Sequence, residues 1–375
     1  MAPELPGVQF EPLGGSTPAW RAAVDVEQWL RAGEDFAARG GRLAAMWASD
    51  DTDRGANLCV RALLVSFEGL ICLELRLPAH DASFPDLSDC FPCADRMQRA
   101  IYDLCGARAL TREGNAADPR PWLRHGAWPE EVFPLRRNVA LGAHWPAQPD
   151  AYRFVEVEGD GVHEIPVGPV HAGTIEPGHF RFSVVGERVL RLEQRLGYKH
   201  KGIEKRFEQM SLGDAIRLAG RVSGDSTVAY AWAYAMALES VCGTSPSDRA
   251  LRLRALLLER ERIANHLGDL GYLGNDGGLA FGLAQFSRLK EDVLRLNARL
   301  FGHRLLMDRI VPGGVAADLD PSAIALLLDE ADRIEREVRA LRAIYDDHAG
   351  LQDRFMTCGR LAPDTAARLG VVGLA

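Results

Sequence analysis

The side chains best suited to chemistry lie in the second half of the chain, and the first two are a histidine and a glutamate. His171 stands in a loop bounded by glycine and proline, and Glu204 stands in the charged run HKGIEKRFE. A carboxylate shielded from water among other titratable groups can have its pKa moved toward neutrality and exchange protons at physiological pH. Taken alone, both residues also fit an ordinary solvent-exposed surface. Proton exchange is the first chemistry that Glu204 suggests.

A turn rich in hydroxyl groups lies within the alanine-rich stretch 212–241. Ser223 and Ser226 are three residues apart, with Gly224 and Asp225 between them, and Tyr230 follows one helical turn later. On a helix, residues spaced in this way share one side. Hydroxyl and phenol groups can hold water or a small organic acceptor through hydrogen bonds. They suit a soft metal poorly, because a serine hydroxyl stays protonated near neutral pH.

Several classes of function lack their sequence signatures. There is no G-x-G-x-x-G after a strand, no P-loop and no H-E-x-x-H. Cys90 and Cys93 form a single C-x-x-C without a second pair, so a zinc knuckle or an iron–sulfur cluster would lack half of its ligands. A formal net charge of −8 at pH 7, with basic residues spread among acids, argues against nucleic-acid binding.

The composition predicts a cytoplasmic protein. No apolar run approaches the roughly 20 residues of a membrane-spanning helix, and the N-terminus lacks a basic-then-apolar secretory signal. Seven cysteines at scattered spacings indicate reduced thiols and not a disulfide framework.

The elements that must position these groups divide the 375 residues into two modules near residue 150. Residues 7–76 alternate helix-like and strand-like patterns, and 60–77 predicts two strands joined near Glu68 and Gly69. Residues 118–150 are rich in proline and tryptophan with weak periodicity, which predicts an extended connection. We therefore predict an α+β fold with domains at 1–117 and 151–375.

The second module is predicted to be a β-hairpin followed by a helical bundle. Residues 179–198 alternate apolar and polar side chains around Gly186 and Glu187, which is typical of a hairpin. Capping residues and apolar periodicity predict helices from Ser245 to Gly271, over 285–309 and from Asp320 to Gly350. The small residues of 212–241 favour a helix at the centre of the bundle.

Four segments of the second module resemble, in order, the large subunit of membrane-bound [NiFe]-hydrogenases and the D subunit of NADH-quinone oxidoreductase, also called complex I. They are GPVHAGTIEPGHFRF (168–182), RLGYKHKGIEKRFE (195–208), ERERIANHLGDLG (259–271) and the stretch 278–315. The N-terminal module resembles the C subunit of the same complexes through DRMQRAIYDLCG (95–106) and DPRPWLRHGAWP (118–129). The chain is thus identified as a member of this superfamily, with C-like and D-like modules fused as in the formate hydrogenlyase type.

The resemblance implies roles for particular residues. His171 matches the family's pocket loop, where a histidine faces quinone in the complex I branch. Glu204 matches the glutamate that relays protons from the metal site in [NiFe]-hydrogenases. Both are expected to converge with the turn 223–226 on one cleft. Glu259, Arg262 and His266 share one helix face, which is either near this pocket or a solvated charged surface.

The resemblance fails at the metal and quinone positions. Nickel-bearing relatives carry R-x-C-G-x-C-x-x-x-H, where this chain has Ser223, Ser226 and Tyr230 in place of the cysteines and the histidine. The complex I branch places a quinone-contacting tyrosine at the position of Gly224. The other nickel ligands of the family lie in a C-terminal D-P-C-x-x-C, and this chain ends at Ala375 within a family-like segment. We therefore expect a C-terminally incomplete sequence and no nickel–iron centre on the family plan.

The resemblance predicts a peripheral-arm subunit of a membrane-anchored respiratory or energy-converting oxidoreductase, held at the inner face of the cell membrane by partner subunits. Electrons would arrive through iron–sulfur clusters of a B-like partner and pass to an acceptor such as quinone, in a pocket lined by His171 and the residues Ser223 to Tyr230. Other peripheral-arm subunits and integral membrane subunits, which move protons or ions, would complete the complex. Apart from a quinone acceptor, no cofactor is expected on this chain itself. Two alternatives stay open: a working [NiFe]-hydrogenase large subunit, and a catalytically silent scaffold that docks an iron–sulfur protein.

Overall fold

The computed structural model describes residues 5–15, 17–55, 57–78, 81–146, 148, 154–170 and 175–371. The chain divides into two compact units. The first consists of Met1–Leu13, Thr17–Glu208 and Ala362–Ala375, and the second of Gly14–Ser16 and Gln209–Leu361. Both contain helices and strands, which agrees with the predicted α+β class.

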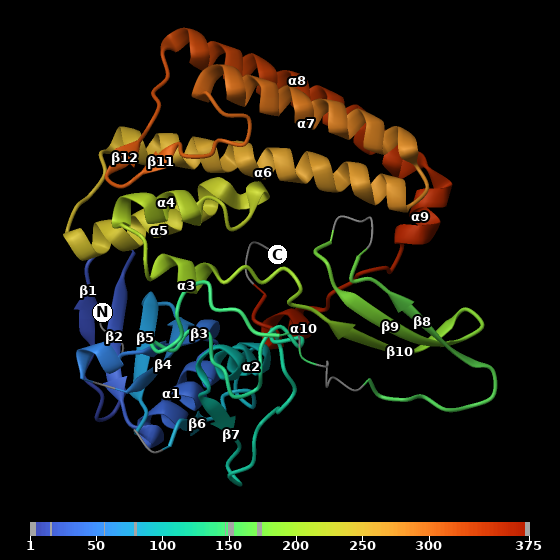
Figure 1. The fold of residues 1–375 in the computed structure, drawn as a ribbon. Helices are drawn as coiled ribbons and strands as arrows, with labels where there is room; N and C mark the ends of the chain where they lie inside the picture. Colours follow the sequence, from blue (N-terminus) through green and yellow to red (C-terminus); the bar gives the residue numbers. More distant parts are fainter. Residues whose placement is uncertain are drawn as a thin grey trace. The chain divides into compact units, whose positions relative to one another are not determined.

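The first unit is built on a five-stranded sheet with the order β1-β2-β5-β4-β3 (Figure 1). The strands are β1 (Glu11–Leu13), β2 (Ala19–Val24), β3 (Arg42–Asp50), β4 (Leu58–Val65) and β5 (Leu70–Arg76). β2 and β5 run parallel, and the other neighbours are antiparallel. β4 and β5 confirm the two strands predicted within 60–77. Gly69 permits the turn between them, because its φ is 137° and a Cβ there would collide with the backbone of Pro18.

Two amphipathic helices pack on this sheet. α1 (Val26–Ala38) contacts β2 and β5, and α2 (Ala94–Cys105) contacts β3. α1 begins with a capping box, in which the Asp25 carboxylate accepts from the Gln28 backbone N–H at 2.8 Å and the Gln28 side chain accepts in return. Smaller elements are the 3₁₀ turn η1 (Thr52–Arg54) and the parallel pair β6 (Ser83–Pro85) and β7 (Arg108–Leu110).

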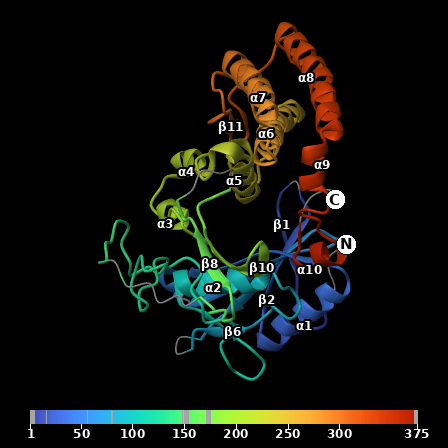
Figure 2. The ribbon, with the colours of Figure 1, turned by 90° about the vertical axis from the view of Figure 1, so that its right-hand side faces the viewer.

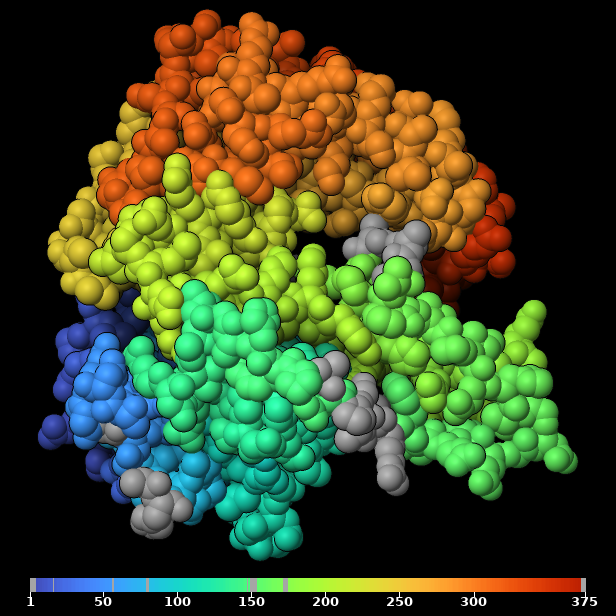
Figure 3. All heavy atoms as spheres, viewed as in Figure 1, coloured from blue at the N-terminus to red at the C-terminus, as the bar shows by residue number. Residues whose placement is uncertain are grey.

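The predicted connection contains no helix or strand over its described residues 118–146. It lies on the outside of the first unit, where its side chains form part of the surface seen in Figure 3. The buried Asp103 carboxylate accepts from the backbone N–H groups of Trp122 and Leu123, both at 2.7 Å. The segment is therefore docked on the α+β module along its length and is not a free linker.

A three-stranded antiparallel sheet follows, with the order β10-β9-β8. Its strands are β8 (Val162–Val167), β9 (His179–Val185) and β10 (Arg188–Arg195). β9 and β10 pair on either side of Gly186, which confirms the predicted hairpin. A short helix, α3 (Ile203–Phe207), comes next.

The contacts place the division between compact units after Glu208, whereas the sequence pattern predicts a division near residue 150. The cause is the docking of the stretch that follows β10 on the connection. The Tyr198 ring stacks on His125 with centroids 4.6 Å apart, and the Lys205 ammonium donates to the Arg136 carbonyl at 3.1 Å. These local contacts are made by side chains that carry no periodicity, so the pattern could not reveal them.

The second unit is a helical bundle. Its helices are α4 (Leu212–Ala219), α5 (Thr227–Cys242), α6 (Asp248–Asp276), α7 (Ala280–Phe301), α8 (Pro321–Asp347) and α9 (Ala349–Phe355), with the 3₁₀ turn η2 (Gly224–Ser226) before α5. α6 and α7 lie side by side as an antiparallel pair (Figure 2). A two-residue ladder joins β11 (Ile310–Val311) and β12 (Gly314–Val315). The last helix, α10 (Pro363–Arg368), belongs to the first unit, where Arg42 donates to the Val371 carbonyl at 3.2 Å.

The predicted bundle helices exist, but their ends differ. α6 begins after Ser247, whose hydroxyl accepts from the Ala250 N–H, and continues past Gly271. The prediction that Gly271 ends this helix is wrong. Gly271 lies inside the helix, where α7 packs closely against it. A Cβ at this position would stand only 3.2 Å from Cβ of Phe286 on α7, so the glycine permits this close packing. α7 ends at Gly302, before the predicted limit of 309, and α8 begins at the predicted Asp320 cap.

Among the described residues, none of the helices has the length and apolar character that crossing a membrane requires.

Candidate functional site

Glu204 lies on α3 in the first unit, and its side chain is exposed. Of the two interpretations that the sequence leaves open for Glu204, a shielded carboxylate and a surface residue, the exposed side chain fits the second. α3 itself is anchored by its neighbour Lys205, which is buried and forms a 2.9 Å ion pair with Glu208. α3 is only five residues long, so the buried Lys205 side chain is enough to hold the helix in place. Glu204, the residue before it, lies at the surface.

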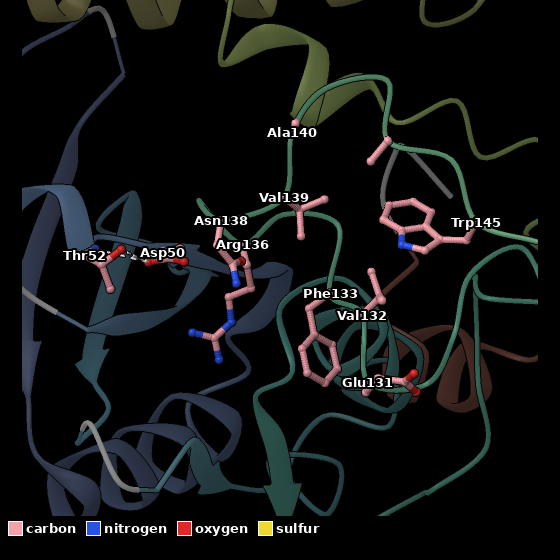
Figure 4. Close-up of a pocket in the computed structure, with 11 residues that line it drawn as sticks. Asp50, Thr52, Glu131, Val132, Phe133, Arg136, Asn138, Val139, Ala140 and Trp145 are labelled. Atoms are coloured by element: carbon pink, nitrogen blue, oxygen red, sulfur yellow. Dashed lines mark hydrogen bonds between the residues drawn. The ribbon is translucent and has the colours of Figure 1, made fainter.

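Two cavities lie in the same unit. One, of about 330 Å³, is lined by Glu204 and Glu208 together with apolar residues of β3 and α2. The other, of about 670 Å³, is lined by Arg136, Asn138, Phe133 and Trp145 of the connection and by Thr52. Figure 4 shows the second cavity, with Asp50 and Thr52 on one side of Arg136 and Trp145 on the other. Asp50 borders both cavities.

Asp50 is a buried, ionised carboxylate. Burial alone would raise its pKa, but hydrogen bonds from the Thr52 hydroxyl and from the backbone N–H groups of Arg137 and Thr52 outweigh burial and hold the pKa below its ordinary value. The carboxylate therefore keeps its negative charge and holds the backbone of the connection at Arg137. It is a structural charge at the border of the two cavities.

The hydroxyl-rich turn lies in the second unit. Ser223 has an extended backbone, with φ −142° and ψ 133°, and Ser226 belongs to the 3₁₀ turn η2. The prediction that both serines lie on one helix is wrong, because α5 begins only at Thr227. The Asn265 side chain of α6 donates to the Asp225 carbonyl at 2.6 Å, which ties the turn to α6. Gly224 forms part of η2, and Tyr230 on α5 is 45% exposed.

Glu261 is the residue at this turn that the sequence analysis missed. Its buried carboxylate accepts from the backbone N–H groups of Val228 at 2.6 Å and Ala229 at 3.2 Å, so it caps the N-terminus of α5 from a neighbouring helix. Burial raises the pKa of Glu261, the two hydrogen bonds lower it, and the charge of Asp225 raises it further; the net direction is upward. The sequence did carry one signal for this contact: Glu261 stands four residues before Asn265, so both side chains lie on the same face of the helix.

Glu259 and Arg262 form a solvated charged face. They make an ion pair at 2.6 Å with both side chains 55% exposed, and His266 is exposed as well. Of the two interpretations left open by the sequence, the exposure of these side chains fits the solvated charged surface. Exposed ion pairs of this kind contribute little to stability.

The remaining predicted site residue is His171, which lies outside the described residues. Glu204 belongs to the first compact unit and the turn 223–226 to the second. The convergence of these three places on one cleft therefore stays a prediction.

The donor groups at the turn do not suit nickel. Ser223 and Ser226 offer hydroxyl oxygens and Tyr230 a phenol, whereas a bridged nickel–iron centre requires soft thiolates. Within the described ranges, no group of three or more His, Cys, Asp or Glu side chains is arranged to hold a metal ion. Cys90 and Cys93 are both free thiols.

The fold is an α+β module followed along the chain by a small three-stranded sheet and a helical bundle. A solved structure of the membrane-bound sulfane sulfur reductase, an archaeal respiratory membrane complex, shares the fold with a TM-score of 0.50 and 22% identity, covering 52% of this chain and 53% of that one. Residues 21–144 match the family "Respiratory-chain NADH dehydrogenase, 30 Kd subunit", and residues 276–375 match the 49 Kd subunit family.

Curated relatives agree with both matches. The chain is 29% identical to formate hydrogenlyase subunit 5 of Escherichia coli (strain K12), over 89% of this chain and 60% of the relative. It is 31% identical to hydrogenase-4 component G of the same organism, over 79% and 53%, and 25% identical to the C/D subunit of NADH-quinone oxidoreductase from Bacteroides thetaiotaomicron, over 77% and 57%. The chain thus spans between half and two thirds of the length of these relatives. It belongs to the superfamily of complex I and membrane-bound [NiFe]-hydrogenase subunits, with 30 Kd-like and 49 Kd-like parts on one chain.

Proposed function

We propose that this chain is a peripheral-arm subunit of a membrane-anchored oxidoreductase complex, held at the inner face of the cell membrane by partner subunits. The observation that carries the proposal is the succession of a 30 Kd-like and a 49 Kd-like part on one chain, in the order of the C/D fusion subunits. Its relatives are named as subunits or components of larger assemblies, so activity is expected only in a complex.

In this complex, an iron–sulfur partner would deliver electrons to an acceptor such as quinone, and membrane subunits would move protons or ions. The contribution of this chain is to bind and orient the acceptor and to handle protons. Glu204 would take the second task, because it stands at the position of the glutamate that relays protons in the hydrogenase relatives it resembles. His171 would face the acceptor, and the hydroxyl groups of Ser223, Ser226 and Tyr230 would donate hydrogen bonds to it.

The rival is a working hydrogenase large subunit, which the names of the first two relatives favour. The chemistry at the turn opposes it, since Ser223 and Ser226 stand where relatives of that kind carry thiolates. A scaffold without catalysis is the third candidate, and it would bind the iron–sulfur partner equally well.

The three functions are separated by one purification. The tagged full-length protein, isolated from membranes of its own organism, should bring with it an iron–sulfur subunit whose clusters give electron paramagnetic resonance signals when reduced. Adding a water-soluble quinone should reoxidise those clusters, and this reoxidation should slow in a Ser226→Phe variant that crowds the turn. Reduced clusters that no added acceptor reoxidises would indicate the scaffold. Reduction of the clusters by hydrogen gas would indicate the hydrogenase.

A further inference from the structure

The cavity between β3, α2 and the connection is lined by apolar side chains from all three segments. Its volume is about 330 Å³. β3 contributes Met46 and α2 contributes Ile101 and Leu104, and all three side chains are buried. The connection contributes Leu123 and Leu135, which pack against the same hydrophobic core. The interior of this cavity is therefore apolar.

The polar and aromatic residues of β3 face away from this interior. Trp47 and Ser49 alternate with Met46 and Ala48 along the strand, so their side chains lie on the opposite face of the sheet. On that face the Ser49 hydroxyl contacts the guanidinium of Arg61, a residue of β4. The wall that β3 presents to α2 is formed by Met46 and Ala48.

The charges at the border of the cavity are of both signs. Arg137 and Glu208 are each engaged in an ion pair. Asp50 is satisfied by hydrogen bonds, and the nearby Arg136 attracts its negative charge. Glu204 is exposed to water. An apolar interior penalises either kind of ion, and this border leaves no group inside to compensate. The cavity therefore favours a neutral ligand.

Backbone hydrogen bonds of the connection hold the roof of the cavity in place. The Leu123 N–H donates to the Asp103 carboxylate of α2 at 2.7 Å, and the Leu135 N–H donates to the Leu104 carbonyl at 2.9 Å. Because the main chain of both leucines is tied to α2, their side chains cannot move inward to fill the space. Ala100 on the α2 wall is too small to fill it. Apolar walls that cannot collapse lack contacts, and a ligand of matching shape restores them.

We propose that this cavity binds a small, neutral aromatic molecule of one or two rings, held between the α2 wall and the roof formed by Leu123 and Leu135. An apolar cavity of about 150 Å³ is large enough to bind benzene, so about 330 Å³ leaves room for a bicyclic ring. The flexible side chains of Met46 and Met97 adapt to its outline. This inference does not rest on the proposed electron transfer, because the acceptor of that reaction is expected at the turn 223–226 in the second unit.

Binding of indole to the purified full-length chain, measured by isothermal titration calorimetry, tests the proposal. For a neutral bicyclic ligand of this size we expect a Kd of about 0.1–1 mM. Indole-5-carboxylate has the same two rings and a negative charge. It should bind at least about tenfold more weakly, because its carboxylate loses water on entering the cavity and finds no free cation there.

The methionines report where the ligand lies. Met46 and Met97 line the cavity, whereas Met356 in the second unit is 69% exposed. In protein isotope-labelled at the methionine methyl groups, saturating indole should shift the nuclear magnetic resonance signals of Met46 and Met97 through the ring current of the ligand. The Met356 signal should stay in place. Single Met→Leu variants assign the three signals.

Two matched substitutions locate the site independently. Ala100→Phe should weaken indole binding at least about tenfold, because the added ring fills the space. Ala38→Phe, at an exposed position of α1 outside the cavity, should bind indole as the unaltered protein does. Ala100→Leu, with folding checked by circular dichroism, replaces Ala100→Phe if the larger side chain unfolds the protein.

Four results would overturn the proposal. They are no binding at 10 mM indole (about ten times the weakest expected Kd), equal binding of the carboxylate, shifts at Met356 without shifts at Met46 and Met97, and unchanged binding in the folded Ala100 variant. None of these measurements involves electron transfer or partner subunits. A failure of the proposed function would therefore leave this site intact, and a failure of this site would leave the proposed function intact.

Discussion

At the scale of single residues, Glu204 combines a proton-relay role proposed from the family resemblance with an exposed position. In the intact complex, Glu204→Gln should slow proton-coupled turnover about tenfold or more, because the amide cannot accept a proton. The exposed side chain contributes little to packing, so the free energy of unfolding should change by less than about 0.5 kcal/mol. Turnover at several pH values measures the first effect and urea unfolding measures the second, with Glu187→Gln as the control in each. Unchanged turnover would return Glu204 to an ordinary surface role.

Glu261 predicts a pH dependence of stability. Burial raises its pKa in the folded state above the unfolded value, so the folded protein holds this proton more tightly. The resulting stabilisation is complete below the unfolded pKa and is lost as the pH rises through the raised folded pKa. Urea unfolding across the acidic range should therefore show a fall in stability with rising pH that is absent in Glu261→Gln. Glu259→Gln, at an exposed position, should keep the wild-type slope, and an equal slope in the Glu261 variant would refute the assignment.

The hydroxyl groups of Ser223 and Ser226 predict the metal content. Each would have to lose a proton at large cost before it bound nickel as an anion. Elemental analysis of the full-length protein in its complex, produced in a host that matures nickel enzymes, should find no stoichiometric nickel. Uptake is expected only after Ser223→Cys and Ser226→Cys, together with any C-terminal ligands that the protein lacks. Near one nickel per chain in the unaltered protein would contradict this.

At the scale of elements, glycines set how closely the bundle helices approach. The Tyr345 hydroxyl of α8 donates to the Leu270 carbonyl of α6 at 2.8 Å, and a Cβ at Gly274 of α6 or Gly282 of α7 would collide with that hydroxyl. The tyrosine therefore fits into a gap that only glycine leaves open.

Gly274→Ala should destabilise the protein by about 1–3 kcal/mol through overpacking, despite the better helix propensity of alanine. Gly213→Ala on α4 is the matched control, because a Cβ there meets nothing within 4 Å. That substitution should stabilise by up to about 1 kcal/mol. Chemical denaturation of both variants decides the matter, and equal effects would mean that Tyr345 moves aside without cost.

At the scale of the whole molecule, the compact units differ from the predicted division. Asp103 accepts three backbone N–H groups, from Trp122, Leu123 and Arg124, and so docks the connection on α2. Limited proteolysis should spare 118–128 and cut first around 209–211, where the units meet in sequence. Asp103→Ala should expose new cuts within 118–128 and cost about 1–3 kcal/mol, because three N–H groups lose their acceptor. Early cuts within 118–128 in the unaltered protein would support the division near residue 150.

Much of the fold is determined by local sequence. Alternating residues specify β4, β5 and the β9–β10 hairpin, since side-chain alternation and strand pairing are properties of neighbouring residues. Capping serines and aspartates specify where α6 and α8 begin, because a cap acts on the next turn alone. The absence of thiolates at Ser223 and Ser226 is likewise a property of the sequence, and by itself it argues against nickel.

Only the tertiary structure decided what depends on distant partners. Glu204 is exposed because Lys205, one residue away, is held by the Arg136 carbonyl of the connection. Glu261 caps α5 across 32 residues of chain, and Gly271 lies inside α6 because Phe286 packs on it. Burial, capping between helices and close packing arise from contacts between segments far apart in sequence, and a local pattern carries no information about which segments will meet.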